Sequence, residues 1–408
     1  MNFKILLSTS FIVTSLSALA QDAGNTFAIT GDGSGDYRWM NIRKVNIATG
    51  KVTQEIYQSN KTAFVLLDAT SKKELAANAQ QLPTTSMVAA AAYDKKHNKL
   101  FFTPMRIGEL RWIDLSAKGD APKFYTEQTQ LLNSLDLKDE ANHITRMDIA
   151  ADGNGYAISN DGNHLIRFTT GKRTVITDLG NLIDAESNKG GISIHNKCTS
   201  WGGDMVADAY GKLYVISANH QIFKVDIDTR ITTHIGTITG LPANYTTNGA
   251  AVDDNENIVV SSANTFEGYY RFSLKDLAAT KIENSDTKYN ASDLANGNLL
   301  FQKEADAKRS FGLAPLPQVV AGTDARIYPN PVTTGEFKVL FDGLQAGQYT
   351  VAISDLSGKA LQGTKVIVSS KLQAQTVKIG TTLAKGMYLV KDTDDTNKMI
   401  FTDRIMVQ

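Results

Sequence analysis

The strongest constraint on the fold is a strand–turn–strand unit that recurs along most of the chain. Three copies begin at Met147, Gly203 and Gly249, and in each an apolar strand, a turn rich in Asp, Asn and Gly, and a second strand follow one another. A third and a fourth strand follow every copy, and a weaker copy begins at Val88. Four strands in every ~40–50 residues are typical of a β-propeller blade. The sequence therefore predicts an all-β propeller over residues 21–312.

The two ends of this region together supply one more blade. Residues 27–57 contain three strands without a first strand, and residues 290–301 contain a lone first strand. Joining them closes the ring and removes the open sheet edges. The sequence contains five candidates for the first strand of a blade but six for the second strand, because Leu299–Phe301 also resembles a second strand. The pattern therefore fits either five or six blades. A pair of β-sandwiches is the rival arrangement, but it does not predict a four-strand recurrence.

Residues 1–20 are typical of a secretory signal peptide. Lys4 gives a basic start, residues 5–16 are apolar with interspersed Ser and Thr, and Ala18-Leu19-Ala20 is a small-x-small cleavage site. A membrane anchor would need ~20 strongly apolar residues, and no later stretch is apolar enough to span a bilayer. We therefore expect an exported protein without a transmembrane segment.

Charge and cysteine content exclude two classes of protein. The chain has 42 Lys+Arg and 42 Asp+Glu, so no excess of positive charge favours binding to nucleic acid. Its single cysteine, Cys198, cannot form an intrachain disulfide. An exported chain of this kind must rely on a large apolar core instead.

The chain divides near residue 320. Four of its eight prolines lie between residues 315 and 331, and residues 313–324 have the composition of a linker. Residues 325–408 alternate polar and apolar positions, which predicts a small antiparallel β-sandwich. The motifs of this region are Tyr328-Pro329-Asn330-Pro331, an Asp-Leu-x-Gly-Lys turn with Gly358, and a Leu-x-x-Gly-x-Tyr turn with Gly386 and Tyr388.

Together with their terminal position, these motifs resemble the C-terminal sorting domain of the type IX secretion system of Bacteroidetes. The resemblance implies an immunoglobulin-like sandwich that the outer-membrane translocon recognises, and a secreted or cell-surface protein. The sequence departs from the family at Asp403-Arg404, where a Lys-rich pair is common.

Three aspartates occupy equivalent places on predicted first strands, which line the centre of a propeller. Asp148, Asp204 and Asp293 could hold a hard cation such as Ca²⁺ through oxygen ligands. Alternatively, they bond neighbouring backbone at the mouth of the channel. Asp94, Asp152, Asp208 and Asp254 lie in turns, where Asp commonly bonds nearby backbone.

Loops that enter first strands and loops between second and third strands share one face of a propeller. Aromatic, Arg and His side chains in these loops could bind a glycan or a peptide, or could simply anchor the loops. The predicted binding residues are Arg38, Trp39, Arg106, His143, Arg146, Trp201, His220, Tyr245 and Phe266.

No catalytic motif accompanies these residues. His-Glu-x-x-His, Gly-x-Ser-x-Gly and P-loop patterns are all absent from the sequence. The sequence therefore favours a non-catalytic binding protein over an enzyme. A metal-dependent hydrolase or lyase that acts in the propeller channel is the alternative.

Overall fold

The computed structural model describes residues 25–408 except 34, 76–81, 120, 285, 313–325, 343, 357, 371, 381–382 and 397. The predicted signal peptide and the predicted linker lie outside the described residues. The chain divides into two compact units, Met1–Ala305 and Asp306–Gln408. Among the described residues, no helix has both the length and the apolar character needed to cross a membrane.

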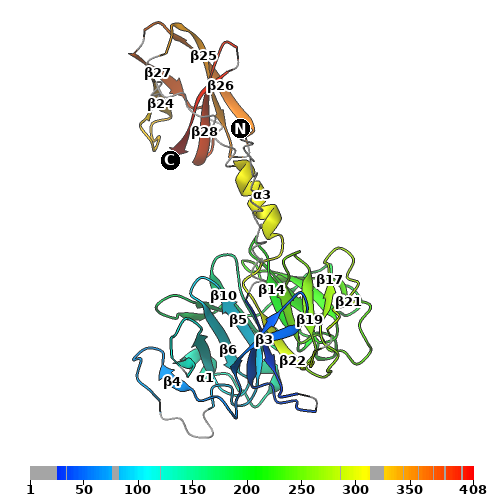
Figure 1. Cartoon of the computed structure of the whole chain (residues 1–408). Coiled ribbons are helices and arrows are strands. Elements are labelled where there is room, and N and C mark those ends of the chain that lie inside the picture. The colour runs from blue at the N-terminus through cyan, green and yellow to red at the C-terminus, as the bar shows by residue number, and fades with distance from the viewer. Residues whose placement is uncertain are drawn as a thin grey trace, which may run out of the picture. The chain divides into compact units, whose positions relative to one another are not determined.

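Five antiparallel sheets of the first unit surround a common centre (Figure 1). From the centre outward, the sheet that joins the two ends of the propeller contains β22 (Ala291–Ala295), β1 (Thr26–Thr30), β2 (Asn41–Asn46) and β3 (Lys51–Tyr57). In the same order, the next two sheets along the chain contain β5 (Val88–Asp94), β6 (Lys99–Pro104), β7 (Glu109–Asp114) and β8 (Lys123–Gln128), and then β9 (Ile144–Ile149), β10 (Asn154–Ser159), β11 (Leu165–Thr169) and β12 (Ile176–Asp178). The last two sheets contain β14 (Asp204–Ala207), β15 (Lys212–Ile216), β16 (Gln221–Asp226) and β17 (Ile231–Thr237), and then β18 (Gly249–Val252), β19 (Ile258–Ser261), β20 (Tyr270–Phe272) and β21 (Thr280–Lys281).

The inner strands contact one another in a closed cycle, from β5 through β9, β14, β18 and β22 back to β5. The predicted β-propeller is therefore confirmed, and the described residues form five blades. Two blades gain a parallel outer strand, β4 (Val65–Asp68) beside β8 and β13 (Ile183–Asp184) beside β17. Short helices α1 (Gln130–Asn133), η1 (Glu140–Asn142) and α2 (Lys197–Ser200) lie in the connections.

The last strand of the propeller closes the ring by pairing with the first. Antiparallel pairing joins Phe27 to Ala295 and Ala28 to Leu294, as the sequence predicts. The segment Leu299–Phe301 does not form the second strand of a sixth blade. Leu300 forms a single parallel bridge with Asp208, and the chain then enters helix α3 (Gln302–Gly312).

Turns between first and second strands follow one local rule. A carboxylate at the start of the turn accepts backbone N–H groups two to four residues later, which satisfies amides that the ladder leaves free. Asp94, Asp152 and Asp208 act in this way. In the blade of β18 the residue is Asp253, which bonds the amides of Asn255 and Asn257, rather than the predicted Asp254.

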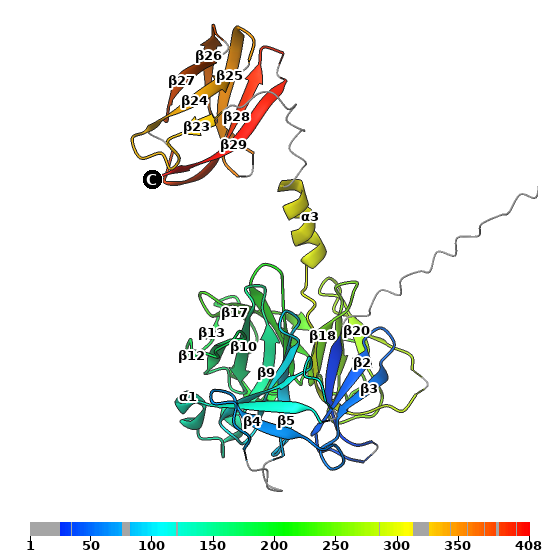
Figure 2. The ribbon, with the colours of Figure 1, turned by 60° about the vertical axis from the view of Figure 1, so that its left-hand side comes forward.

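The second unit is a two-layer β-sandwich, as predicted (Figure 2). One sheet contains β23 (Arg326–Tyr328), β24 (Glu336–Asp342) and β27 (Leu372–Lys378), and the other contains β26 (Ala360–Val368), β25 (Gly347–Ser354), β28 (Gly386–Asp394) and β29 (Met399–Val407). Alternate residues of both sheets face one core, which includes Phe337, Val339, Val351 and Val390.

Candidate functional site

The three aspartates of the inner strands bond the backbone of the neighbouring blade. Asp148 accepts the N–H of Ile149 at 2.8 Å with one oxygen and that of Ala207, on β14, at 2.7 Å with the other. Asp204 repeats this arrangement with Met205 and Ala250, both at 2.7 Å.

Asp293 completes the set on the strand that closes the ring. It accepts the N–H of Ala91, on β5, at 2.9 Å, and its other oxygen is buried without a partner. Each of these carboxylates therefore ties one inner strand to the next.

Burial dominates the electrostatics of these carboxylates. It raises the pKa of Asp148 to about 7, although two N–H groups bond the carboxylate and act in the opposite direction. The pKa values of Asp204 and Asp293 are also raised, first by burial and further by the charges of the other aspartates. Among the described residues, no three His, Cys, Asp or Glu side chains are grouped so that they could hold a metal ion.

Several of the predicted binding residues lie inside the propeller. Arg146 has no exposed surface, and its guanidinium donates to the carbonyl oxygens of Ser159, Asn160, Ser200 and Gly202. Burial lowers the pKa of Arg146 to about 10. Such a side chain holds loops together and offers no free group to a ligand.

Tyr245 and His143 are also buried. The Tyr245 hydroxyl donates to the carbonyls of Val260 and Gly268 at 2.9 Å each. The ring of His143 contacts the carbonyl of Leu137 through Nε2 at 3.0 Å. These residues therefore anchor their loops, which is the alternative that the sequence left open.

Three further predicted residues are partly buried and bonded to backbone. Trp39 donates its indole N–H to the carbonyl of Ala263 at 3.3 Å, and Trp201 donates to His195 at 3.2 Å. His220 contacts the carbonyl of Tyr245.

The last three predicted residues are Arg38 and Arg106, which are exposed, and Phe266, which is partly buried. The Arg38 side chain is 66% exposed and pairs with Asp36, and Arg106 is exposed as well. Phe266 meets the half-exposed Tyr37 edge-on, with ring centroids 5.7 Å apart. Arg38, Arg106 and Tyr37 are therefore exposed on this face.

The opposite side of the ring carries both chain connections. We call it the turn side, because first strands turn there into second strands. β1 begins and β22 ends on this side, since Phe27 is paired with Ala295. Residues 296–303, which we call the exit strap, then cross this end of the inner strands from the blade of β22 past that of β18 to that of β14.

The exit strap is fixed by backbone and side-chain bonds. Leu300 donates its N–H to Ala207 and accepts that of Ala209, at 3.0 and 2.9 Å, and its side chain is buried. The Asn298 amide donates to the carbonyl of Val252 at 3.0 Å. Lys303 donates its ammonium group to the carbonyl of Asp254 at 2.6 Å.

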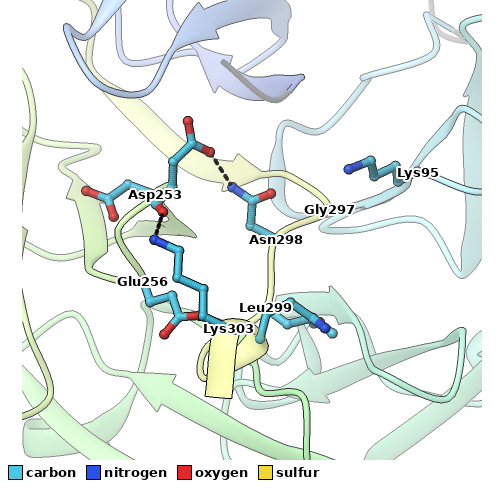
Figure 3. Close-up of a pocket in the computed structure, with 9 residues that line it drawn as sticks. Lys95, Asp253, Glu256, Gly297, Asn298, Leu299 and Lys303 are labelled. Atoms are coloured by element: carbon cyan, nitrogen blue, oxygen red, sulfur yellow. Dashed lines mark hydrogen bonds between the residues drawn. The ribbon is translucent and has the colours of Figure 1, made fainter. Parts of the chain in front are cut away.

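Two hollows flank the exit strap and share Lys95, Gly297 and Leu299 in their walls. The first, which we call the acidic hollow, has a volume of about 380 Å³. Figure 3 shows Asn298 and Lys303 directed toward the turn of Asp253, with Lys95 on the other side of Gly297. The remaining residues that line it are Asp254, Glu256 and Gln302.

The second hollow, which we call the histidine hollow, has a volume of about 400 Å³. It lies between the turns that follow β5 and β9, and Thr169, Thr170 and Gly171 line another wall. His97 also lines it, and its Nδ1 lies 2.5 Å from Oδ2 of the buried Asp94. Volumes of this size are typical of small-ligand sites.

Sequence reasoning missed both hollows, since it treated the turn aspartates as structural and searched the opposite face. One signal was present. The run Lys95-Lys96-His97-Asn98-Lys99 is the most basic turn between a first and a second strand.

The predicted sorting motifs occupy defined places in the second unit. The Asn330 side chain bonds β29 on both sides, because it donates to the carbonyl of Arg404 at 2.7 Å and accepts the N–H of Met406 at 2.9 Å. Gly358 has φ +88° in the turn that starts at Asp355. Tyr328 is exposed, and Pro329 and Pro331 flank Asn330.

The Leu-x-x-Gly-x-Tyr turn occurs twice in this unit. The hydroxyl of Tyr388 donates to the carbonyl of Ala384 at 2.7 Å, and that of Tyr349 donates to Gln345 at 2.9 Å. Gly386 and Gly347 open the strands that follow. The second copy was visible in the sequence as Leu344-Gln345-Ala346-Gly347-Gln348-Tyr349.

Comparisons with solved structures return chains of low sequence identity. PorZ of Porphyromonas gingivalis, described as an essential bacterial surface component of the type-IX secretion system, is 15% identical, with a TM-score of 0.31; the match covers 94% of this chain and 51% of that one. The extracellular domain of a putative hybrid two-component system from B. thetaiotaomicron is 12% identical, with a TM-score of 0.31, 90% of this chain and 48% of that one covered.

A chain of the nidogen/laminin complex is 13% identical, with a TM-score of 0.36; the match covers 68% of this chain and 99% of that one. This protein thus spans about half the length of the first two solved chains. No curated protein matches it.

The family comparison concerns the second unit. Residues 326–408 match the model of the secretion system C-terminal sorting domain. These are the residues that form the sandwich and carry the motifs described above. Residues 326–408 are therefore a type IX C-terminal sorting domain, and the protein is exported to the cell surface or secreted.

Proposed function

We propose that this protein is a non-catalytic binding protein, made with a cleaved signal peptide over residues 1–20 and delivered by type IX secretion in a member of the Bacteroidetes. Its propeller takes up a glycan or a peptide in the hollows beside the exit strap. The observation that carries this proposal is the pair of adjoining hollows, of about 380 and 400 Å³, in a closed ring of sheets. Such a ring holds its turns rigidly, so little conformational freedom is lost when a ligand binds.

Gly171 offers a direct test, because it lines the histidine hollow and a Cβ there would meet no atom within 4 Å. Gly171→Trp should fill the hollow without disturbing the fold. Gly363, on an exposed part of β26 in the sorting domain, has equally open space and gives the matched control Gly363→Trp.

Binding of the full chain and both variants is measured on glycan and peptide arrays. We expect that Gly171→Trp loses ligands which the parent and Gly363→Trp retain. Identical profiles for all three proteins would reject the hollow as the binding site, and turnover of a bound ligand would reject a non-catalytic role.

The aromatic pair Tyr37–Phe266 favours a second candidate site on the opposite side of the ring. Aromatic faces bind sugars and peptide side chains, and Arg38 adds a charged donor beside them. If Tyr37→Ala loses the array ligands while Gly171→Trp keeps them, the site is this pair.

A metal-dependent hydrolase or lyase in the channel has weaker support. The oxygens of Asp148 and Asp204 that such a reaction would need are occupied by backbone N–H groups.

A further inference from the structure

We propose that the histidine hollow selects ligands with an anionic group, such as an acidic saccharide, and that Lys95, Lys96 and His97 provide the selectivity. This inference rests on the proposed function and adds the chemical class of the ligand. The polar groups of the hollow differ in whether they already have partners within the chain.

The two carboxylates in the wall are already satisfied. Asp94 accepts the N–H groups of Lys96 and His97 with one oxygen and the imidazole with the other. Asp152 accepts from the backbone and side chain of Asn154 and from the hydroxyl of Tyr156. Each carboxylate therefore already accepts three hydrogen bonds from the chain, of the about four that a carboxylate can accept.

The basic side chains of the wall, in contrast, still have groups without a partner among the described residues. Lys95 and Lys96 are exposed, and neither ammonium group forms an ion pair or a hydrogen bond with the part of the chain that the structure describes. The contact with Asp94 uses Nδ1 of His97 and leaves Nε2 for a ligand. The charged groups of the wall that have no partner are therefore cationic.

A ligand with a carboxylate, sulfate or phosphate supplies acceptors for these groups, and charge-assisted hydrogen bonds to it are the strong ones. Lys99 and the turn residues Lys172 and Arg173 add positive charge nearby, although none of the three lines the hollow. Hydroxyl groups of a sugar suit Nε2 of His97, because a hydroxyl can both donate and accept a hydrogen bond.

Gly297 keeps Lys95 in place. A Cβ on Gly297 would lie 2.8 Å from Cβ of Lys95, so the exit strap packs directly on the stem of this lysine. The strap therefore positions Lys95 at the edge that the two hollows share.

The test uses the full chain and three small probes, namely trigalacturonate, its uncharged methyl ester and inorganic phosphate, with binding measured by calorimetry. We expect trigalacturonate to bind at least about tenfold more tightly than its ester. The double variant Lys95→Ala/Lys96→Ala should lose this preference. The matched control Lys172→Ala, which removes a nearby charge outside the hollow, should retain it.

The other outcomes are distinguishable. Phosphate that competes with trigalacturonate in the parent would identify the anionic group itself as the recognised feature, which supports the proposal. Equal affinity for the acid and the ester, abolished by Gly171→Trp, would overturn the anionic selectivity and keep the hollow as a binding site. Equal loss of affinity in Lys172→Ala would show a diffuse surface charge effect and overturn the assignment to Lys95 and Lys96.

Discussion

The carboxylate of Asp204 accepts the N–H of Ala250 at 2.7 Å across the seam between two blades. Asp148 and Asp293 make the same kind of bond at two other seams, to Ala207 and Ala91. The inner strands of a propeller do not share a hydrogen-bonded ladder, because each belongs to a different sheet. These side chains therefore supply polar links between neighbouring blades in addition to the apolar packing.

The three aspartates at the seams between blades, Asp148, Asp204 and Asp293, should make the free energy of unfolding depend on pH. Burial raises the pKa of Asp148 from 3.8 to about 7, so between these values the folded protein holds a proton that the unfolded chain has released. The free energy of unfolding attributable to Asp148 is therefore greatest below pH 3.8 and falls as the pH rises toward 7. We expect Asp148→Asn to reduce the decrease in stability between pH 4 and 7, measured by urea unfolding at several pH values. An unchanged slope would contradict this assignment.

Arg146 should be a structural residue. Arg146→Ala leaves buried carbonyls of two loops without a donor, and we expect a loss of about 2–4 kcal/mol in the free energy of unfolding. Arg38→Ala is the control, since the side chain of this arginine is exposed and its removal should leave the free energy of unfolding nearly unchanged. Chemical denaturation of both variants gives the comparison, and similar values for the two would show that burial of Arg146 is not important.

Gly203 is required by steric contact as well as by its backbone angle. Its φ is +91°, and a Cβ there would lie 1.9 Å from the carbonyl oxygen of Ile216. Gly211 has a similar φ of +80° but open space around it. We expect Gly211→Ala to cost about 1 kcal/mol and Gly203→Ala clearly more, because only the latter forces β14 and β15 apart. Equal melting temperatures for the two variants would refute the steric argument.

The sorting domain should determine where the protein goes. Deletion of residues 326–408 removes the whole sandwich and, with it, the strand β29 that Asn330 holds. We expect the truncated protein to accumulate in the periplasm, as detected by fractionation and surface labelling of intact cells. Surface labelling of the truncated protein at the level of the full chain would mean that another segment directs its export.

The four-strand repeat of the propeller could be predicted from the sequence, because each blade repeats the same local pattern of strands and turns. Strands alternate in polarity, and an aspartate such as Asp152 starts each turn by bonding nearby amides. Leu299–Phe301 was ambiguous, because an apolar run of three residues fits a strand as well as a strap. The contact of Leu300 with the end of β14, about ninety residues earlier in the chain, shows that this segment is part of the strap.

The surroundings of charged side chains could not be predicted in the same way. Two oxygens of Asp148 suit a metal ion and a pair of amides equally well, and only the position of Ala207 distinguishes the two. Arg146 lies beside polar loop residues and was expected at the surface, yet backbone carbonyls that are distant in sequence surround it. The hollows have no local signature, since turns of separate blades and the exit strap form them together.

The exit strap also determines which bonds of the propeller bear tension applied to the chain. β1 and β22 are antiparallel and leave the ring on the same side, so tension between them would separate their hydrogen bonds one pair at a time, starting from Phe27 and Ala295. Any pull on the chain beyond Lys303 reaches the bonds of Leu300 and Asn298 before it reaches β22. Tension applied to the chain beyond Lys303 is therefore borne first by the bonds of the exit strap, before it reaches the paired strands β22 and β1.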